Sequence, residues 1–99
     1  MGGATMAARV QALREAFRGN RLDWRLVSSG AYFAWVRHPF HGESSTGVAR
    51  RLAREHGVLC VPGATFGPEL DRYLRFAFAN VDAALMPALM QRLLECQDA

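Results

Sequence analysis

Arg75 has the clearest chemical potential, because it is the single charge in the apolar run Tyr73 to Ala79. Successive side chains of a strand point to opposite faces, so Leu74 and Phe76 share one face and Arg75 lies on the other. If that second face is covered, the guanidinium needs an anionic partner, because an unpaired buried charge is costly. Its planar fork of donors matches a carboxylate. The alternative is an arginine on the wet face of an amphipathic strand, and this strand alone favours that alternative.

A second group of possible ligands comprises His38 and His41, with Glu43 nearby. Imidazole and carboxylate groups can bind zinc. These residues lie in a proline-containing loop, however, and neither His56 nor Cys60 is obviously adjacent to them. We therefore expect loop histidines exposed to solvent and no metal site.

The charged residues are unusual, because all twelve basic residues are arginines and the chain has no lysine. The formal net charge of +3 is mild, and solvated helix surfaces explain it better than a nucleic-acid interface does. Cys60 and Cys96 are too few for a secreted disulfide scaffold, which favours free thiols in a reducing cytosol. With no apolar run of membrane-spanning length and no signal peptide, we expect a cytoplasmic protein without a membrane or nucleic-acid partner.

The first half of the chain predicts one helix and one clear strand. The helix covers Ala4 to Arg18, and the segment Leu22 to Val27 is extended or irregular. The strand covers Ala31 to Val36 and alternates large apolar side chains on both of its faces, so it must be covered on both sides.

The second half predicts a helix between a Ser44 or Ser45 cap and Gly57, followed by short strands over Val58 to Val61 and Tyr73 to Ala79. A final helix covers Asp82 to Glu95, or begins at Met86 with Pro87 as its first residue. Its inward side chains are expected to be leucines (Leu85, Leu89, Leu93 and Leu94).

The resulting order is α-β-α-β-β-α over a single domain of residues 1–99. This pattern predicts the α+β class, as a two-layer domain with helices packed on a small sheet of about three strands.

Three segments resemble, in order and spacing, motifs of the class I and II pyridoxal-phosphate-dependent aminotransferases, which belong to the aspartate aminotransferase superfamily of fold type I. They are Gly30-Ala31-Tyr32-Phe33-Ala34-Trp35-Val36, Gly57-Val58-Leu59-Cys60-Val61-Pro62-Gly63-Ala64-Thr65-Phe66-Gly67 and Tyr73-Leu74-Arg75-Phe76-Ala77-Phe78-Ala79. The similarity covers nearly the whole chain. It identifies the chain as the C-terminal small domain of such an enzyme, with residues 1–19 as the end of the helix that joins the two domains.

The resemblance implies a parent protein that transfers an amino group from an amino acid to a 2-oxo acid. Arg75 matches the arginine that binds the α-carboxylate of the substrate, and Tyr32 and Phe33 match positions near the substrate side chain. A plain core aromatic is an equal alternative for Tyr32 and the favoured one for Phe33. Gly63 and Phe66 match residues that shape the loop beside the cleft.

The cofactor of the family is pyridoxal 5'-phosphate, which a lysine holds as a Schiff base. Because this chain has no lysine, we expect it to contain no catalytic residue, to bind no cofactor and to be inactive alone. The implied partners are the missing large cofactor-binding domain, the amino-acid or 2-oxo-acid substrate, and a second copy in a homodimeric parent.

Two other function classes stay open. The segment Arg75 to Phe78 resembles the aromatic strand of an RNA-recognition motif, although the glycine after the basic residue is missing. The other class is a stand-alone protein-interaction domain. An exposed apolar patch on Tyr32, Val36 or Trp24 is expected both for such a domain and for an enzyme fragment.

Overall fold

The computed structural model describes residues 6–18, 22–29, 33–77 and 86–99, apart from the side chains of Met6 and Arg9. Within these ranges the chain forms three α-helices: α1 (Met6–Arg18), α2 (Ser45–His56) and α3 (Met86–Asp98). The strands are β1 (Arg25–Ser29), β2 (Phe33–Arg37), β3 (Val61–Pro62) and β4 (Tyr73–Ala77). Two short 3-10 turns, η1 (Gly63–Thr65) and η2 (Pro68–Leu70), connect β3 to β4.

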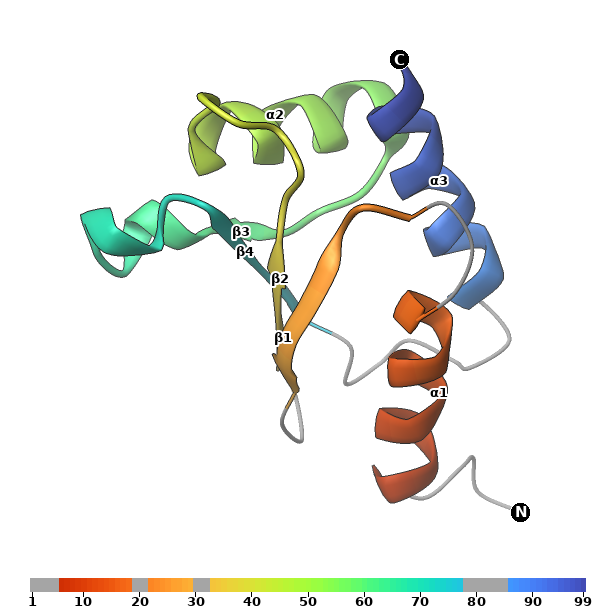
Figure 1. The fold of residues 1–99 in the computed structure, drawn as a ribbon. Helices are drawn as coiled ribbons and strands as arrows, with labels where there is room; N and C mark the ends of the chain where they lie inside the picture. The colour runs from red at the N-terminus through yellow and green to blue at the C-terminus, as the bar shows by residue number, and fades with distance from the viewer. Residues whose placement is uncertain (1–5, 19–21, 30–32, 78–85) are drawn as a thin grey trace.

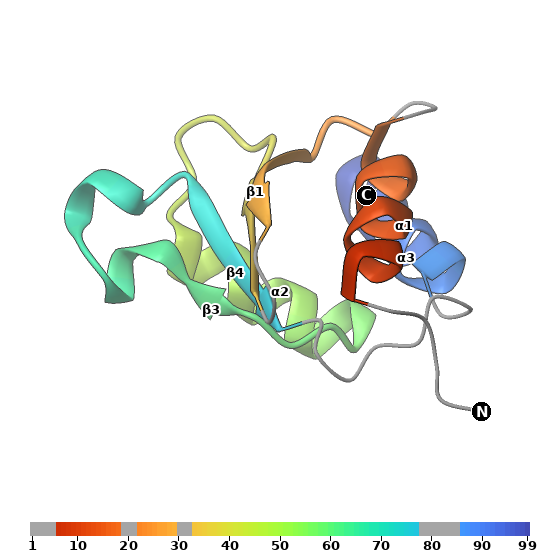
Figure 2. The same cartoon turned by 90° about the horizontal axis from the view of Figure 1, so that it is seen from below.

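The four strands form one antiparallel sheet in the order β1-β2-β4-β3. Helices α1 and α3 pack against each other beside the strands, and α2 lies across the sheet (Figures 1 and 2). The predicted two-layer α+β class is therefore confirmed. The sheet has one strand more than expected, because residues 25–29 pair with β2 as an edge strand.

One face of the sheet carries the hydrophobic core. Ala34 and Val36 of β2 lie opposite Phe76 and Leu74 of β4, and all four side chains are buried. The helices add buried side chains to the same cluster: Leu13, Phe17, Val48, Leu52, Met90 and Leu93. Since the side chains of a strand alternate, the neighbours of these strand residues must point to the opposite face. We call it the uncovered face, because the three described helices contribute their buried side chains to the core on the other side.

Two residues expected in an exposed patch, Val36 and Trp24, are core residues instead, so that expectation was wrong. Trp24 is 0% exposed, its indole N–H donates to the carbonyl of Leu93 at 3.1 Å, and its ring meets the edge of Phe40 at 5.6 Å between centroids. Tyr32, the third residue of that expected patch, lies outside the described residues.

The helix ends largely follow the sequence. The hydroxyl of Ser44 accepts a hydrogen bond from the Gly47 N–H at 3.0 Å and caps α2, and Gly57 ends α2 in the left-handed conformation. Helix α3 begins at Met86, the alternative start that Pro87 suggested, and Leu93 is buried as expected. The other buried positions of α3 are Met86, Met90 and Cys96, because its buried face is rotated relative to the leucine stripe. In the described residues, no helix is both long and apolar enough to cross a membrane.

Candidate functional site

Arg75 lies at the centre of the uncovered face of the sheet. In the register of the strands it is opposite Trp35 of β2 on one side and Val61 of β3 on the other. Directly opposed residues of antiparallel strands point to the same face, so both neighbours accompany Arg75 there. The Arg75 side chain is half-buried. The sequence allowed two alternatives, a fully buried arginine and a solvent-exposed one, and the observed position lies between them.

Two phenyl rings enclose the guanidinium of Arg75. Its central carbon lies 4.1 Å from the ring centroid of Phe33 and 4.6 Å from that of Phe66. Its Nε atom is buried and has no hydrogen-bond partner among the described residues. The distances from the guanidinium carbon to the two ring centroids are both within the range of attractive cation–π contacts. In the same parts of the chain, no carboxylate forms an ion pair with this cation.

The Arg75 side chain lines a concavity of about 260 Å³ on this face. The lining is mainly apolar (Phe33, Leu59, Cys60, Val61 and Ala77, besides Arg75). Cys60 is a free thiol, as is Cys96, and burial raises the pKa of Cys60 to about 12, so it stays neutral. One fixed cation in an apolar hollow can bind a carboxylate that carries an apolar group.

The structure brings together some of the predicted site residues and adds another. Phe33 contacts Arg75 and is 43% exposed, so it is not the core aromatic that we favoured. Tyr32, the third predicted site residue, lies outside the described residues. Phe66 was assigned only to the shape of the loop, yet it contacts the guanidinium directly. No periodicity along the sequence could predict this contact. Phe66 lies in the loop after η1, and it contacts the sheet only because of the tertiary path of that loop.

Exposed apolar side chains gather around Arg75. Of the four large hydrophobic residues that are exposed in the described parts of the chain, Phe33 and Leu59 line the concavity and Phe66 stacks on the guanidinium. The fourth, Val27, lies on β1. Apolar patches of this kind commonly mark binding surfaces.

The histidines do not form a site. His38 is fully buried, contrary to our expectation of solvent exposure, whereas His41 is exposed. The Phe40 N–H donates to Nδ1 of His38 at 3.3 Å, so Nε2 carries the proton and donates to the carbonyl of Asp71 at 3.2 Å. Burial lowers the pKa of His38, which favours this neutral form. Among the described residues, no three metal-binding side chains lie together.

His38 is part of a polar cluster, together with Asp71 and Ser45, that fixes the start of α2. The carboxylate of Asp71 accepts hydrogen bonds from the N–H and the hydroxyl of Ser45, both at 2.8 Å. These bonds lower the pKa of Asp71. The Ser45 hydroxyl also accepts a bond from the Ala64 N–H at 3.1 Å, so the loop after β3 is tied to the helix. This cluster has a structural explanation.

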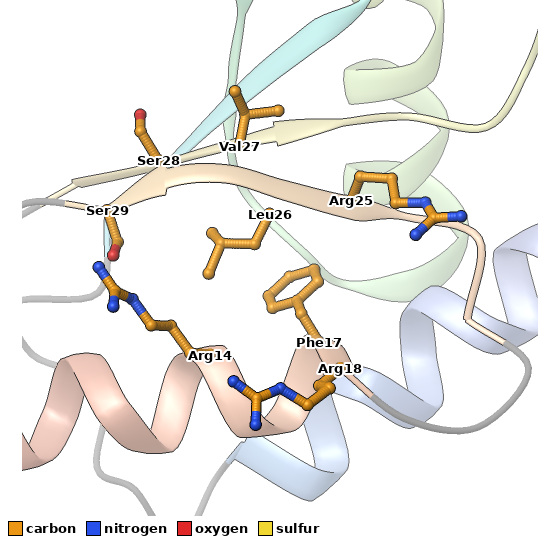
Figure 3. A pocket seen from close by; sticks show the side chains of 8 residues that line it. All are labelled: Arg14, Phe17, Arg18, Arg25, Leu26, Val27, Ser28 and Ser29. Carbon is orange, nitrogen blue, oxygen red and sulfur yellow. The ribbon is translucent and has the colours of Figure 1, made fainter.

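A second hollow, of about 390 Å³, lies between α1 and β1 and is shown in Figure 3. Three arginines line it: Arg14 and Arg18 from α1, and Arg25 from β1. Arg14 reaches towards Ser29, whereas Arg25 lies at the other end of the strand (Figure 3). Because these cations do not converge on one point, we place the candidate site at Arg75.

Comparison with known proteins identifies a matching family and solved structures with the same fold. Residues 3–93 match the family model for aminotransferase class I and II. The comparison with curated proteins yields no match.

Three solved structures share the fold. An aromatic aminotransferase from Pyrococcus horikoshii superposes with a TM-score of 0.77 at 21% identity, over 94% of this chain and 24% of that one. An aspartate aminotransferase from Rhodobacter sphaeroides gives 0.74 at 19%, over 94% and 24%, and an aminotransferase from Staphylococcus aureus gives 0.65 at 26%, over 91% and 22%. This chain thus spans about a quarter of the length of these proteins.

Proposed function

Because the chain belongs to the class I and II aminotransferase family, we propose that it is the C-terminal small domain of an enzyme that transfers an amino group from an amino acid to a 2-oxo acid. We propose further that Arg75 binds the α-carboxylate of the substrate. The observation that carries this proposal is a guanidinium without an anionic partner among the described residues, at the mouth of an apolar concavity.

The chemistry of Arg75 suits this role. A charge-assisted hydrogen bond to a carboxylate contributes about 1.5–3 kcal/mol, and a bidentate pair also fixes the orientation of the ligand. The apolar lining accommodates the rest of the substrate, and Phe33 contributes one wall. Tyr32 is proposed, on the family resemblance, to lie near the substrate side chain. The domain would thereby orient the substrate for a reaction whose other groups lie elsewhere.

The residues of this chain do not fit the cofactor of the family. Pyridoxal 5'-phosphate supplies the electron sink for amino-group transfer, and it requires a lysine for its Schiff base. The chain has no lysine, and the cation among the described residues that line the concavity is a guanidinium, which cannot form that bond. We therefore propose that the cofactor is held by residues outside these 99, and that the chain alone is inactive.

The exposed apolar residues around Arg75 support a further part of the proposal, that the large cofactor-binding domain of the parent docks on this face. A homodimeric parent and a cytoplasmic location are proposed on the family resemblance alone. An RNA-binding function is not favoured by the structure, because Phe76 is buried in the core and cannot stack on a base.

Binding of a simple carboxylate tests the role of Arg75. We would titrate the isotopically labelled chain with propionate, at constant ionic strength, and follow by NMR both the Arg75 side-chain signal and the backbone amide signals of Cys60 and Ala77, which line the concavity and remain present in every variant. A saturable shift with a Kd of the order of 10 mM is expected for one charged pair. Propionamide, which has the same shape without the charge, should give no such shift.

Two variants make the test specific. Arg75→Gln should abolish propionate binding. Arg37 is an exposed arginine of β2 that lies on the same face of the sheet as Arg75, and Arg37→Gln should leave propionate binding unchanged. Binding that survives Arg75→Gln would refute the assigned role. Amino-group transfer by the isolated chain supplied with pyridoxal 5'-phosphate would refute the proposal that it is inactive alone.

A further inference from the structure

We infer that Phe33 and Phe66 are positioning residues, which hold the guanidinium of Arg75 between two rings before a carboxylate arrives. This inference rests on the proposed function, because it assigns the means by which the proposed carboxylate-binding arginine is oriented. The family match assigns neither ring to this task. We name this arrangement of Phe33, Phe66 and Arg75 the aromatic clamp.

The two rings reach Arg75 from independent elements. Phe33 belongs to β2, where it lies opposite Ala77 and is thus a diagonal neighbour of Arg75 on the uncovered face. Phe66 follows η1 and comes from the β3 side of the sheet. A cation held from two elements has fewer accessible rotamers than one that stacks on a single ring, so less side-chain entropy is lost on binding.

The ring of Phe66 is itself fixed. Its centroid lies 5.5 Å from that of Trp35 in an edge-to-face arrangement, and its N–H donates to the carbonyl of Gly63 at 2.9 Å. Gly63 is packed so closely against the first residue of β4 that a Cβ there would lie 2.6 Å from the carbonyl oxygen of Tyr73. The loop that carries Phe66 is therefore anchored to the strand that carries Arg75.

Among the described residues, no hydrogen bond accounts for the orientation of Arg75. Its Nε atom is buried and has no partner within the described parts of the chain. Because Nε is enclosed, a carboxylate can approach only the two terminal nitrogens of the guanidinium. The aromatic contacts are thus the interactions that set which edge of the cation faces the concavity.

The experiment compares the propionate affinity of Phe66→Leu and Phe33→Leu with that of the unchanged chain. Each variant keeps an apolar side chain but removes one ring of the clamp. We expect each Kd to rise about fivefold, and Phe66→Tyr, which restores a ring, to return it to within about twofold. The ring-current shift of the Arg75 Nε–H signal should decrease in both leucine variants.

Phe40→Leu is the matched control. Phe40 forms the same kind of contact with another arginine, because the Arg51 guanidinium carbon lies 4.5 Å from its ring centroid. Arg51 does not line the concavity, so Phe40→Leu should leave propionate affinity unchanged. Circular dichroism and thermal unfolding identify any variant that has lost its fold, and Phe66→Tyr keeps the comparison valid if the leucine variants are unstable.

The outcomes separate the two proposals. If Phe33→Leu and Phe66→Leu bind propionate as tightly as the unchanged chain while Arg75→Gln does not bind, the clamp is overturned and the proposed function stands. If the unchanged chain shows no saturable shift, the proposed function is overturned and the clamp with it. The expected result is a loss of affinity in Phe33→Leu and Phe66→Leu, no binding in Arg75→Gln, and unchanged affinity in Phe40→Leu.

Discussion

Replacing Trp24 by phenylalanine tests whether the sheet has one covered face and one open face. Trp24 is fully buried against Phe40, and its indole N–H donates to the carbonyl of Leu93 on α3. The substitution removes a buried hydrogen bond, which is worth about 1 kcal/mol. The smaller ring also leaves a gap that costs about 1–2 kcal/mol. We therefore expect the free energy of unfolding to fall by about 2–3 kcal/mol.

Trp35→Phe is the matched substitution on the open face. Trp35 is half-buried and contacts Phe66, so the same change should cost less than about 1 kcal/mol. Urea denaturation followed by circular dichroism measures both. With a slope of about 1.5 kcal/mol per molar, the midpoint should fall by about 1.3–2 M for Trp24→Phe and by less than about 0.7 M for Trp35→Phe.

Equal losses for the two tryptophans would contradict this reasoning. They would mean that the face carrying Arg75 is as much a part of the core as the face under the helices. The half-buried guanidinium would then be a structural residue, and its assignment to a carboxylate would lose its physical basis.

Three further predictions concern the polar loop, a helix end and the open face. Burial holds the pKa of His38 below its ordinary 6.5, so the unfolded chain takes up the proton first and stability should fall as the pH drops below about 6.5. In urea titrations at pH 7.5 and 5.5, His38→Gln should flatten this dependence, and the exposed His41→Gln should not. Gly57→Ala should cost about 1 kcal/mol in thermal unfolding, because φ is +67° there. Leu59, which is 82% exposed, should drive weak self-association that Leu59→Glu abolishes in sedimentation equilibrium; a strictly monomeric chain at high concentration would contradict this.

The elements with strong local signals could be predicted from the sequence. Helix α2 has a serine cap and a left-handed glycine end, both of which act within a few residues. Strand β1 has no such signal, because a bulge between Leu26 and Ser28 interrupts the two-residue alternation and most of the strand is exposed. Its pairing with β2 is a tertiary property.

Burial of individual side chains was the least predictable feature. His38 lies in a loop with a proline and a nearby glycine, which is typical of exposed segments. It is buried because Asp71 and Arg72, more than thirty residues away, fold back over it: Asp71 accepts from its ring, and the carbonyl of Arg72 accepts from its N–H at 3.0 Å. Trp24 is buried for the same kind of reason, since its partner Leu93 is 69 residues away.

The candidate site was half predictable. The two-residue period along β4 is a local property of the sequence, and it correctly places Arg75 on the face opposite Leu74 and Phe76. The contact with Phe33 follows from the pairing of β2 with β4, which the sequence does not specify. The contact with Phe66 depends on the path of the loop after η1, which is fixed by tertiary contacts and leaves no periodic signal.

Alternation along β4 couples the stability of the domain to the placement of its cation. Leu74 and Phe76 are buried opposite Val36 and Ala34, and that same register sets Arg75 opposite Trp35. A one-residue slip of β4 in this register would turn the guanidinium into the core and expose Leu74 and Phe76 to solvent. Both changes cost free energy, so both disfavour the slipped register. The packing that stabilises one face therefore also fixes the position of the charge on the other. A site built in this way needs only the aromatic clamp to complete its orientation, because the backbone position is already determined by the core.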